Sequence, residues 1–146
     1  MLDAAVVQLG YAGDLTAQQA HNILIAEPAA VLVDTRTLAE WQFVGVPDLT
    51  KSGKEVVFLD WQVYPDMRIR TDFAERLLAK GVSKDQKVLL ICRSGVRSRA
   101  AALALTQAGF NAAYNVSDGF EGSLDALGHR GRDRGWKALG LPWIQQ

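Results

Sequence analysis

One stretch of the chain, residues 87–105, joins a continuous apolar run to an alanine-rich run through a short loop containing glycine and arginine. The apolar run at 87–91 is typical of a parallel strand buried on both faces, and it ends at Cys92, the only cysteine. The alanine-rich run predicts a helix over 98–108, closed by Gly109. This order places Cys92 at the carboxyl end of a strand, the edge where open parallel sheets bind ligands.

Strand and helix patterns alternate along the rest of the chain. Further strands are predicted at 30–34, 55–59 and 112–116, and helices at 17–26, 37–43 and 72–80. Irregular structure is predicted at 44–54 and 61–70, whereas 118–127 permits one more helix. The alternation favours a three-layer α/β/α fold, with a mostly parallel central sheet and helices on both faces.

The length of 146 residues fits one domain over residues 1–146, with a core at about 15–127 and a C-terminal extension, 128–146, packed on it. Lysine and arginine together number 16, and so do aspartate and glutamate. A net charge of zero gives no reason to expect nucleic acid or a membrane surface as partner.

A single cysteine cannot form an internal disulfide, which favours a reducing compartment. The first ten residues lack the basic and apolar segments of a signal peptide, and no apolar run is long enough to cross a bilayer. We therefore predict a cytoplasmic protein. His21 and His129 have no cysteine or histidine at metal-ligand spacing, so we expect neither a metal ion nor another cofactor.

The start of the helix after Cys92 offers free N–H groups and a partial positive charge, which favour the reactive thiolate. Gly95 permits a curled loop, Arg93 and Arg97 can hold an anion, and Ser98 either donates a hydrogen bond or only caps the helix. We predict Cys92 as the catalytic nucleophile and the residues after it as substrate-binding: Arg93, Ser94, Gly95, Val96, Arg97 and Ser98.

Polar residues also follow the other predicted strands. Asp34 ends the strand at 30–34, where it can tune the site or tie down loop N–H groups. Asp60 and Trp61 follow the strand at 55–59 and can line the pocket, although packing of Trp61 in the core is an equal alternative. Arg36 and Glu40 are predicted to form a structural ion pair.

Three motifs lie between about Leu15 and the end of the chain: VDTRTLAEW at 33–41, CRSGVRS at 92–98 and NVSDGFEG at 115–122. Together they resemble motifs of the rhodanese (thiosulfate sulfurtransferase) family in its single-domain form. The loop at 92–98 is by far the most specific of the three. The sequence departs from the family at 45–49, which reads GVPDL, and at Asp118, which stands where a glycine is usual.

The resemblance implies a five-stranded parallel sheet flanked by helices, with a persulfide carried on Cys92. It also implies a sulfurtransferase that moves sulfane sulfur from a small anionic donor, such as thiosulfate, to a thiophilic acceptor. A second hypothesis is a persulfide carrier for a protein acceptor, in tRNA thiolation or cofactor sulfuration. A cysteine phosphatase or arsenate reductase ranks lower, because phosphatases have arginine six positions after the cysteine and this chain has Ser98 there.

Overall fold

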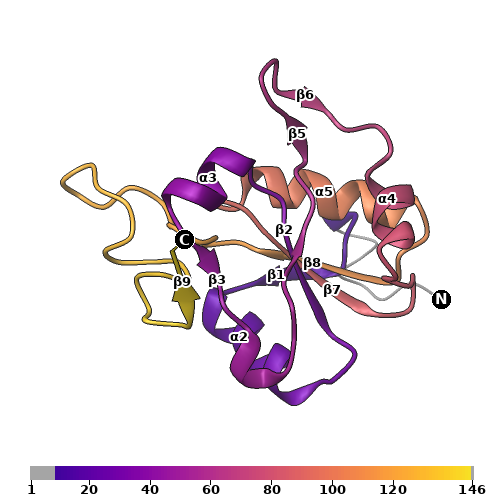
Figure 1. Cartoon of the computed structure of the whole chain (residues 1–146), viewed down its shortest axis with the longest axis horizontal. Helices are drawn as coiled ribbons and strands as arrows, with labels where there is room; N and C mark the ends of the chain where they lie inside the picture. Colours follow the sequence, from indigo (N-terminus) through magenta and orange to yellow (C-terminus); the bar gives the residue numbers. More distant parts are fainter. Residues whose placement is uncertain (1–8, 146) are drawn as a thin grey trace.

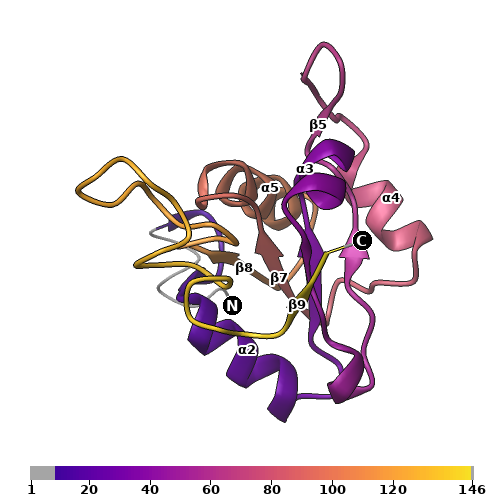
Figure 2. The ribbon, with the colours of Figure 1, turned by 60° about the vertical axis from the view of Figure 1, so that its left-hand side comes forward.

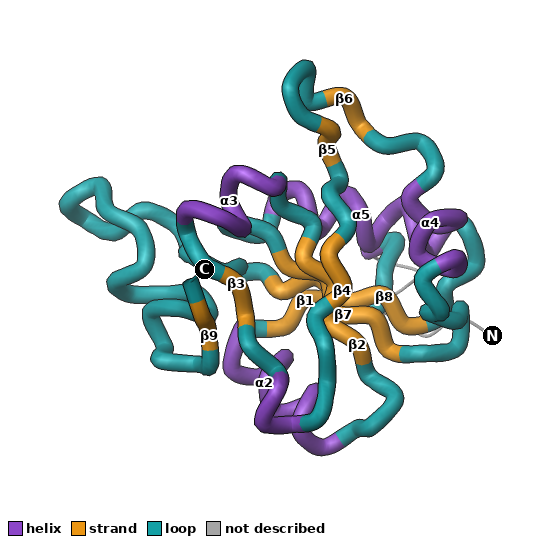
Figure 3. Tube along the Cα trace, in the orientation of Figure 1, coloured by secondary structure: helices purple, strands orange, loops and turns teal. Residues whose placement is uncertain are grey.

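The computed structural model describes residues 9–145, and strands occupy its centre (Figures 1 and 3). They form a five-stranded, all-parallel sheet in the order β1-β8-β7-β2-β4. The strands are β1 (Gly13–Leu15), β2 (Val31–Asp34), β4 (Val57–Phe58), β7 (Lys87–Ile91) and β8 (Ala112–Val116). Four of them lie within or at the predicted strands. The structure therefore confirms the predicted α/β class and the five-stranded parallel sheet.

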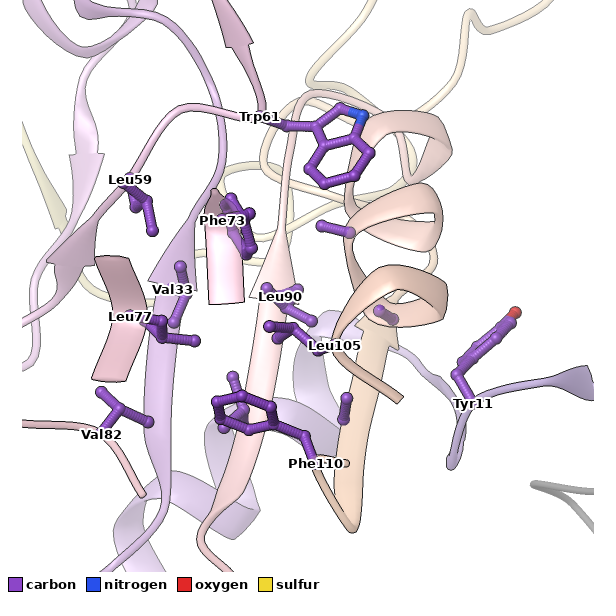
Figure 4. Close-up of a cluster of buried hydrophobic side chains, with 14 residues drawn as sticks. Tyr11, Val33, Leu59, Trp61, Phe73, Leu77, Val82, Leu90, Leu105 and Phe110 are labelled. Atoms are coloured by element: carbon purple, nitrogen blue, oxygen red, sulfur yellow. The ribbon is translucent and has the colours of Figure 1, made fainter. Parts of the chain in front are cut away.

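Helices cover both faces of the sheet (Figure 2). α2 (Ala17–Ala26) packs on one face, and α4 (Phe73–Ala79) and α5 (Val96–Gln107) pack on the other. Phe73, Leu77 and Leu105 from the latter pair meet Val33 and Leu90 of the sheet in one buried cluster (Figure 4). Because side chains alternate along a strand, the neighbouring sheet residues join a second cluster against α2.

Local capping explains where two of the helices begin. Thr16 and Gln19 form a reciprocal capping box at the start of α2, whose bounds are those predicted. Thr37 and Glu40 form a second box at α3 (Leu38–Phe43), which lies at the carboxyl edge of the sheet. α5 begins at Val96, two residues before the prediction, because the loop after Cys92 closes directly into the first helical turn.

Several short elements escape the sequence prediction. β1 is a three-residue edge strand, and β3 (Val46–Pro47) pairs with β9 (Trp143–Ile144) in a region predicted as loop. β5 (Gln62–Val63) and β6 (Arg68–Ile69) form a hairpin that projects beyond the sheet beside α3 (Figure 1). A 3₁₀ turn, η1, occupies Thr50–Ser52.

The helix permitted at 118–127 is wrong, because this segment forms turns. Gly119 and Gly122 have φ of 66° and 78°, a backbone conformation that a right-handed helix excludes. Their missing side chains let the segment lie directly against the backbone of Arg93 and of Arg134.

Residues 128–145 lie on the α2 side of the sheet and return to pair β9 with β3. Trp136 is fully buried in the second cluster, and its indole N–H donates to the carbonyl of Pro142 at 2.6 Å. No helix within residues 9–145 is long and apolar enough to cross a membrane.

Candidate active site

Cys92 follows β7 directly, and its side chain is buried, with 1% exposed. It lies on the α5 side of the sheet, the side of Val88 and Leu90. The Gly95 N–H donates to Sγ at 3.1 Å, and Ser98 Oγ of α5 lies 3.2 Å from Sγ. The structure thus brings three residues of the predicted loop together around one sulfur atom.

Gly95 has a positive φ, the backbone conformation that the predicted curl of the loop requires. Its φ is 100°, and a Cβ at this position would collide with the carbonyl of Ser117. Any larger residue would therefore disturb both the curl and the N–H that faces Sγ. The carbonyls of Cys92 and Arg93 accept hydrogen bonds from Phe120 N and Glu121 N, at 2.8 and 3.0 Å, so the 118–122 turn supports the loop from behind.

The amino end of α5 begins immediately after Gly95. The first N–H groups of a helix have no acceptor within it, and its dipole places partial positive charge at that end. α5 has twelve residues, so the dipole behind the sulfur is that of more than three turns. This arrangement suits an anionic sulfur or an anionic ligand beside Cys92.

Arg97 does not point a free guanidinium into solvent. Its Nη1 and Nη2 donate to Oε1 and Oε2 of Glu40 at 2.6 and 2.9 Å. Burial raises the pKa of the Glu40 carboxyl, but hydrogen bonds and charge from Arg97 outweigh burial and leave that pKa below its ordinary value. The same hydrogen bonds raise the pKa of Arg97.

The predicted Arg36–Glu40 ion pair is therefore wrong. Arg36 is fully buried and pairs with Asp34 at 2.7 Å, while its guanidinium covers the ring of Phe120. The reason is the alternation along β2: Asp34 is in register with Ile91, which faces the second cluster, so Asp34 and Arg36 lie on the side of the sheet away from Cys92. Asp34 also accepts the Arg36 N–H at 3.1 Å, which is the loop-tying role.

Two cavities are lined by residues of α3 and of the β5–β6 hairpin, and the first is also lined by two residues of the Cys92 loop. One, of about 290 Å³, is lined by Glu40, Gln62, Met67, Arg93 and Arg97. The other, of about 470 Å³, is lined by Leu38, Ala39, Gln42, Asp60, Val63 and Tyr64 and is largely apolar. The β5–β6 hairpin contributes Gln62 and Met67 to the first cavity and Val63 to the second, in a segment predicted as irregular structure.

Asp60 and Trp61 reach the active-site edge in different ways. Asp60 lines the larger cavity and accepts a hydrogen bond from Arg70 Nη2 at 2.5 Å. Trp61 is 8% exposed and packs edge-on against Phe73, which is the core alternative (Figure 4). Of the remaining loop residues, Ser94 is half-buried and Val96 is exposed.

The sequence reasoning missed Asn115 as a member of the site. Its Oδ1 lies 2.6 Å from Ser98 Oγ, and the residue is 2% exposed. An asparagine inside the apolar strand predicted at 112–116 was the available signal, because a buried amide needs hydrogen-bond partners.

Comparisons with known proteins match nearly the whole chain. Residues 12–146 match the family described as the STR4 middle domain. An uncharacterized protein of Rickettsia conorii is 39% identical over 131 residues, covering 89% of this chain and 95% of that protein. The protein named THYLAKOID RHODANESE-LIKE, chloroplastic, of Oryza sativa subsp. indica is 29% identical, but the match covers only 25% of its length and 90% of this chain.

A crystal structure of Rv0390 from M. tuberculosis is similar to the present structure. The two chains are 50% identical and superpose with a TM-score of 0.83, covering 93% of this chain and 99% of the other.

Proposed function

The chain belongs to the STR4 middle-domain family, a rhodanese-like family, and from this premise we propose that it is a sulfurtransferase working through a persulfide on Cys92. The observation that carries the proposal is the Cys92 sulfur, held at the end of β7 by the Gly95 N–H and in front of the first turn of α5. A reactive thiolate and an anionic persulfide both need such donors.

The reaction divides into two half-reactions. In the first, the Cys92 thiolate attacks the outer sulfur of thiosulfate, the S–S bond of the donor breaks, and sulfite leaves with the electron pair. In the second, a nucleophilic acceptor takes the outer sulfur of the persulfide, and Cys92 leaves as a thiolate. The loop N–H and the helix start stabilise the anionic sulfur in both half-reactions.

Arg93 is the better candidate to bind an anionic donor. Arg97 is already held by the Glu40 carboxylate, whereas Arg93 lines the same cavity and is exposed. None of the ion pairs within residues 9–145 involves Arg93. Its guanidinium can therefore offer two parallel donors to a sulfonate.

A persulfide carrier for a protein partner is the second candidate. The apolar cavity adjoins exposed apolar side chains, with Leu38 60% and Tyr64 71% exposed, and Val96 on the loop itself is 75% exposed. Exposed apolar side chains on the loop and on the elements near it favour contact with a protein surface over a small ion. We also propose that the protein is cytoplasmic, because a single cysteine that forms no internal disulfide is typical of a reducing compartment.

Mass spectrometry of the intact protein tests the proposal. After incubation with thiosulfate the protein should gain the mass of one sulfur atom, and cyanide should then remove this mass and yield thiocyanate. Cys92→Ser should gain nothing while retaining its fold by circular dichroism. A mass gain in Cys92→Ser, or no gain in the wild type with either thiosulfate or a small persulfide, would refute the proposal.

A further inference from the structure

A continuous series of hydrogen bonds connects the Cys92 sulfur with the edge strand β1. Ser98 Oγ lies 3.2 Å from Sγ and 2.6 Å from Asn115 Oδ1. Asn115 Nδ2 donates to Asp14 Oδ1 at 3.0 Å, and the Tyr11 hydroxyl donates to the same oxygen at 2.7 Å. The register of β1 with β8 aligns Asp14 with Asn115, which makes the connection possible.

The chemistry of these groups fixes the direction of each hydrogen bond. An ionised carboxylate only accepts, so the amide nitrogen of Asn115 faces Asp14 and its carbonyl oxygen faces Ser98. The Ser98 hydroxyl has one hydrogen, and the 2.6 Å contact with an amide carbonyl requires that hydrogen. Ser98 Oγ therefore presents lone pairs to Cys92, which suit a thiol S–H and do not suit a thiolate.

We propose that Asn115 and Asp14 are positioning residues that hold the Ser98 hydroxyl as an acceptor for the Cys92 thiol, and so set the pH at which this sulfur becomes reactive. When Sγ loses its proton to solvent, the Ser98 hydroxyl turns to donate to the thiolate. Asn115 Oδ1, which is buried, then loses its donor. Since a buried acceptor without a donor is unfavourable, the series opposes formation of the thiolate.

Other charged groups lie on the elements packed around the Cys92 loop and have to be kept constant in a test. They are Arg93 and Arg97 on the loop and first turn, Glu40 on α3, Arg99 on α5, Asp118 after β8, and the Asp34–Arg36 pair across the sheet. Tyr11 and Asp14 come from the β1 side, and burial followed by the hydrogen bond to Asp14 raises the pKa of Tyr11. Only two substitutions that remove the same charge can separate the effect of the hydrogen bonds from the electrostatic effect of these charged groups.

Asp14 offers such a matched pair of variants, because its side chain is exposed and a substitution there leaves no cavity in the core. Asp14→Asn removes the charge but retains an oxygen that accepts from Asn115 Nδ2. Asp14→Ala removes the same charge and also the acceptor, so the Asn115 amide is free to turn its nitrogen to Ser98. The Ser98 hydroxyl then donates to Cys92 without leaving a buried carbonyl unsatisfied.

The measurement is the rate of iodoacetamide alkylation against pH, which reports on Cys92 alone because the chain has no other cysteine. The midpoint of Asp14→Ala should lie below that of Asp14→Asn by about one pH unit, since one hydrogen bond of this kind changes an equilibrium by about tenfold. This readout needs no sulfur donor, so it remains valid if the proposed sulfur transfer fails.

The same two substitutions in a Ser98→Ala background provide the control. Without the hydroxyl, Asp14→Ala and Asp14→Asn should have equal midpoints. Equal midpoints in the presence of Ser98 would overturn the proposal, and so would a difference that persists in the Ser98→Ala background.

Discussion

At the scale of single residues, the two arginines near Cys92 differ in how they are engaged. Both terminal nitrogens of Arg97 donate to Glu40, and we therefore propose Arg93 as the residue that binds an anionic donor. Arg93→Ala should raise the KM for thiosulfate roughly ten- to a hundredfold, the usual effect of losing a charged hydrogen-bond partner. Transfer from a loaded persulfide to cyanide should hardly change, because the sulfonate has left with sulfite.

Timing the two half-reactions separately checks this prediction, and Arg97→Ala is the comparison. Arg97→Ala should slow both half-reactions, because it removes the contact that fixes the first turn of α5 to α3. A KM effect confined to Arg97→Ala, with Arg93→Ala like the wild type, would contradict the assignment of the donor site to Arg93.

The Glu40–Arg97 pair also predicts a pH dependence of stability. The pKa of Glu40 is lowered in the folded protein, so its carboxylate stabilises the fold above the ordinary carboxyl pKa, and this contribution is lost as the pH falls through the lowered value. Glu40→Gln should be less stable than the wild type at neutral pH, and the difference should shrink on acidification. Urea unfolding at a series of pH values measures it, and a constant difference would exclude this linkage.

The sequence predicted the placement of those candidate site residues that lie close together in the chain. Cys92 and Gly95 belong to this group, since strand, loop and helix follow one another directly. The partner of Glu40 could not be predicted, because Arg97 lies 57 residues away and only the tertiary fold brings the two side chains together. Asn115 and Asp14 are likewise joined by the register of β1, a strand too short to have a recognisable pattern.

At the scale of elements, length and apolar continuity decided what could be predicted. β7 and β8, with five residues each, have the predicted bounds, because inner strands bury both faces and are largely apolar, with Asn115 as the exception in β8. β3, β5, β6 and β9 have two residues each, too few for a recognisable pattern, and β3 pairs with β9 across almost 100 residues. The 118–122 turn takes its shape from backbone contact with the Cys92 loop.

Gly95, in the loop between β7 and α5, should be more sensitive to substitution than a glycine elsewhere with a similar φ. Gly95 and Gly81 both have left-handed φ, of 100° and 93°, but only at Gly95 would a Cβ meet another backbone. Gly81→Ala should lower the free energy of unfolding by about 1–2 kcal/mol, the usual strain of this conformation, and leave persulfide loading intact. Gly95→Ala should be more destabilised and load sulfur about a hundredfold more slowly, since the N–H that faces Sγ is displaced.

Urea unfolding and the rate of mass gain with thiosulfate measure these two effects. Gly81→Ala controls for left-handed strain alone. Normal loading by a folded Gly95→Ala variant would show that the curl of the loop is not needed for the reaction.

At the scale of the whole molecule, the C-terminal extension is connected to the candidate active site through the 118–122 turn. The backbone N–H of Trp136 donates to the carbonyl of Gly119 at 2.9 Å, and Gly119 lies against the backbone of Arg93. The Trp136 side chain meanwhile fills the cluster beneath the sheet. The extension, the turn and the Cys92 loop are therefore layers of one packed structure, and we propose that the chain unfolds as one cooperative domain.

Trp136→Ala tests this cooperativity. Removing a fully buried tryptophan should lower the free energy of unfolding by about 3–5 kcal/mol. Trp143→Ala is the matched control: it removes the same kind of side chain from a half-buried position and should be less damaging. Far-UV circular dichroism and alkylation of Cys92, followed over the same urea series, should show one transition with a common midpoint in every variant. The extension would be a separate unit if the tryptophan fluorescence of Trp136→Ala showed an additional unfolding transition at low urea. In that case the alkylation of Cys92 would keep its wild-type midpoint. The 118–122 turn alone would then support the loop that follows Cys92.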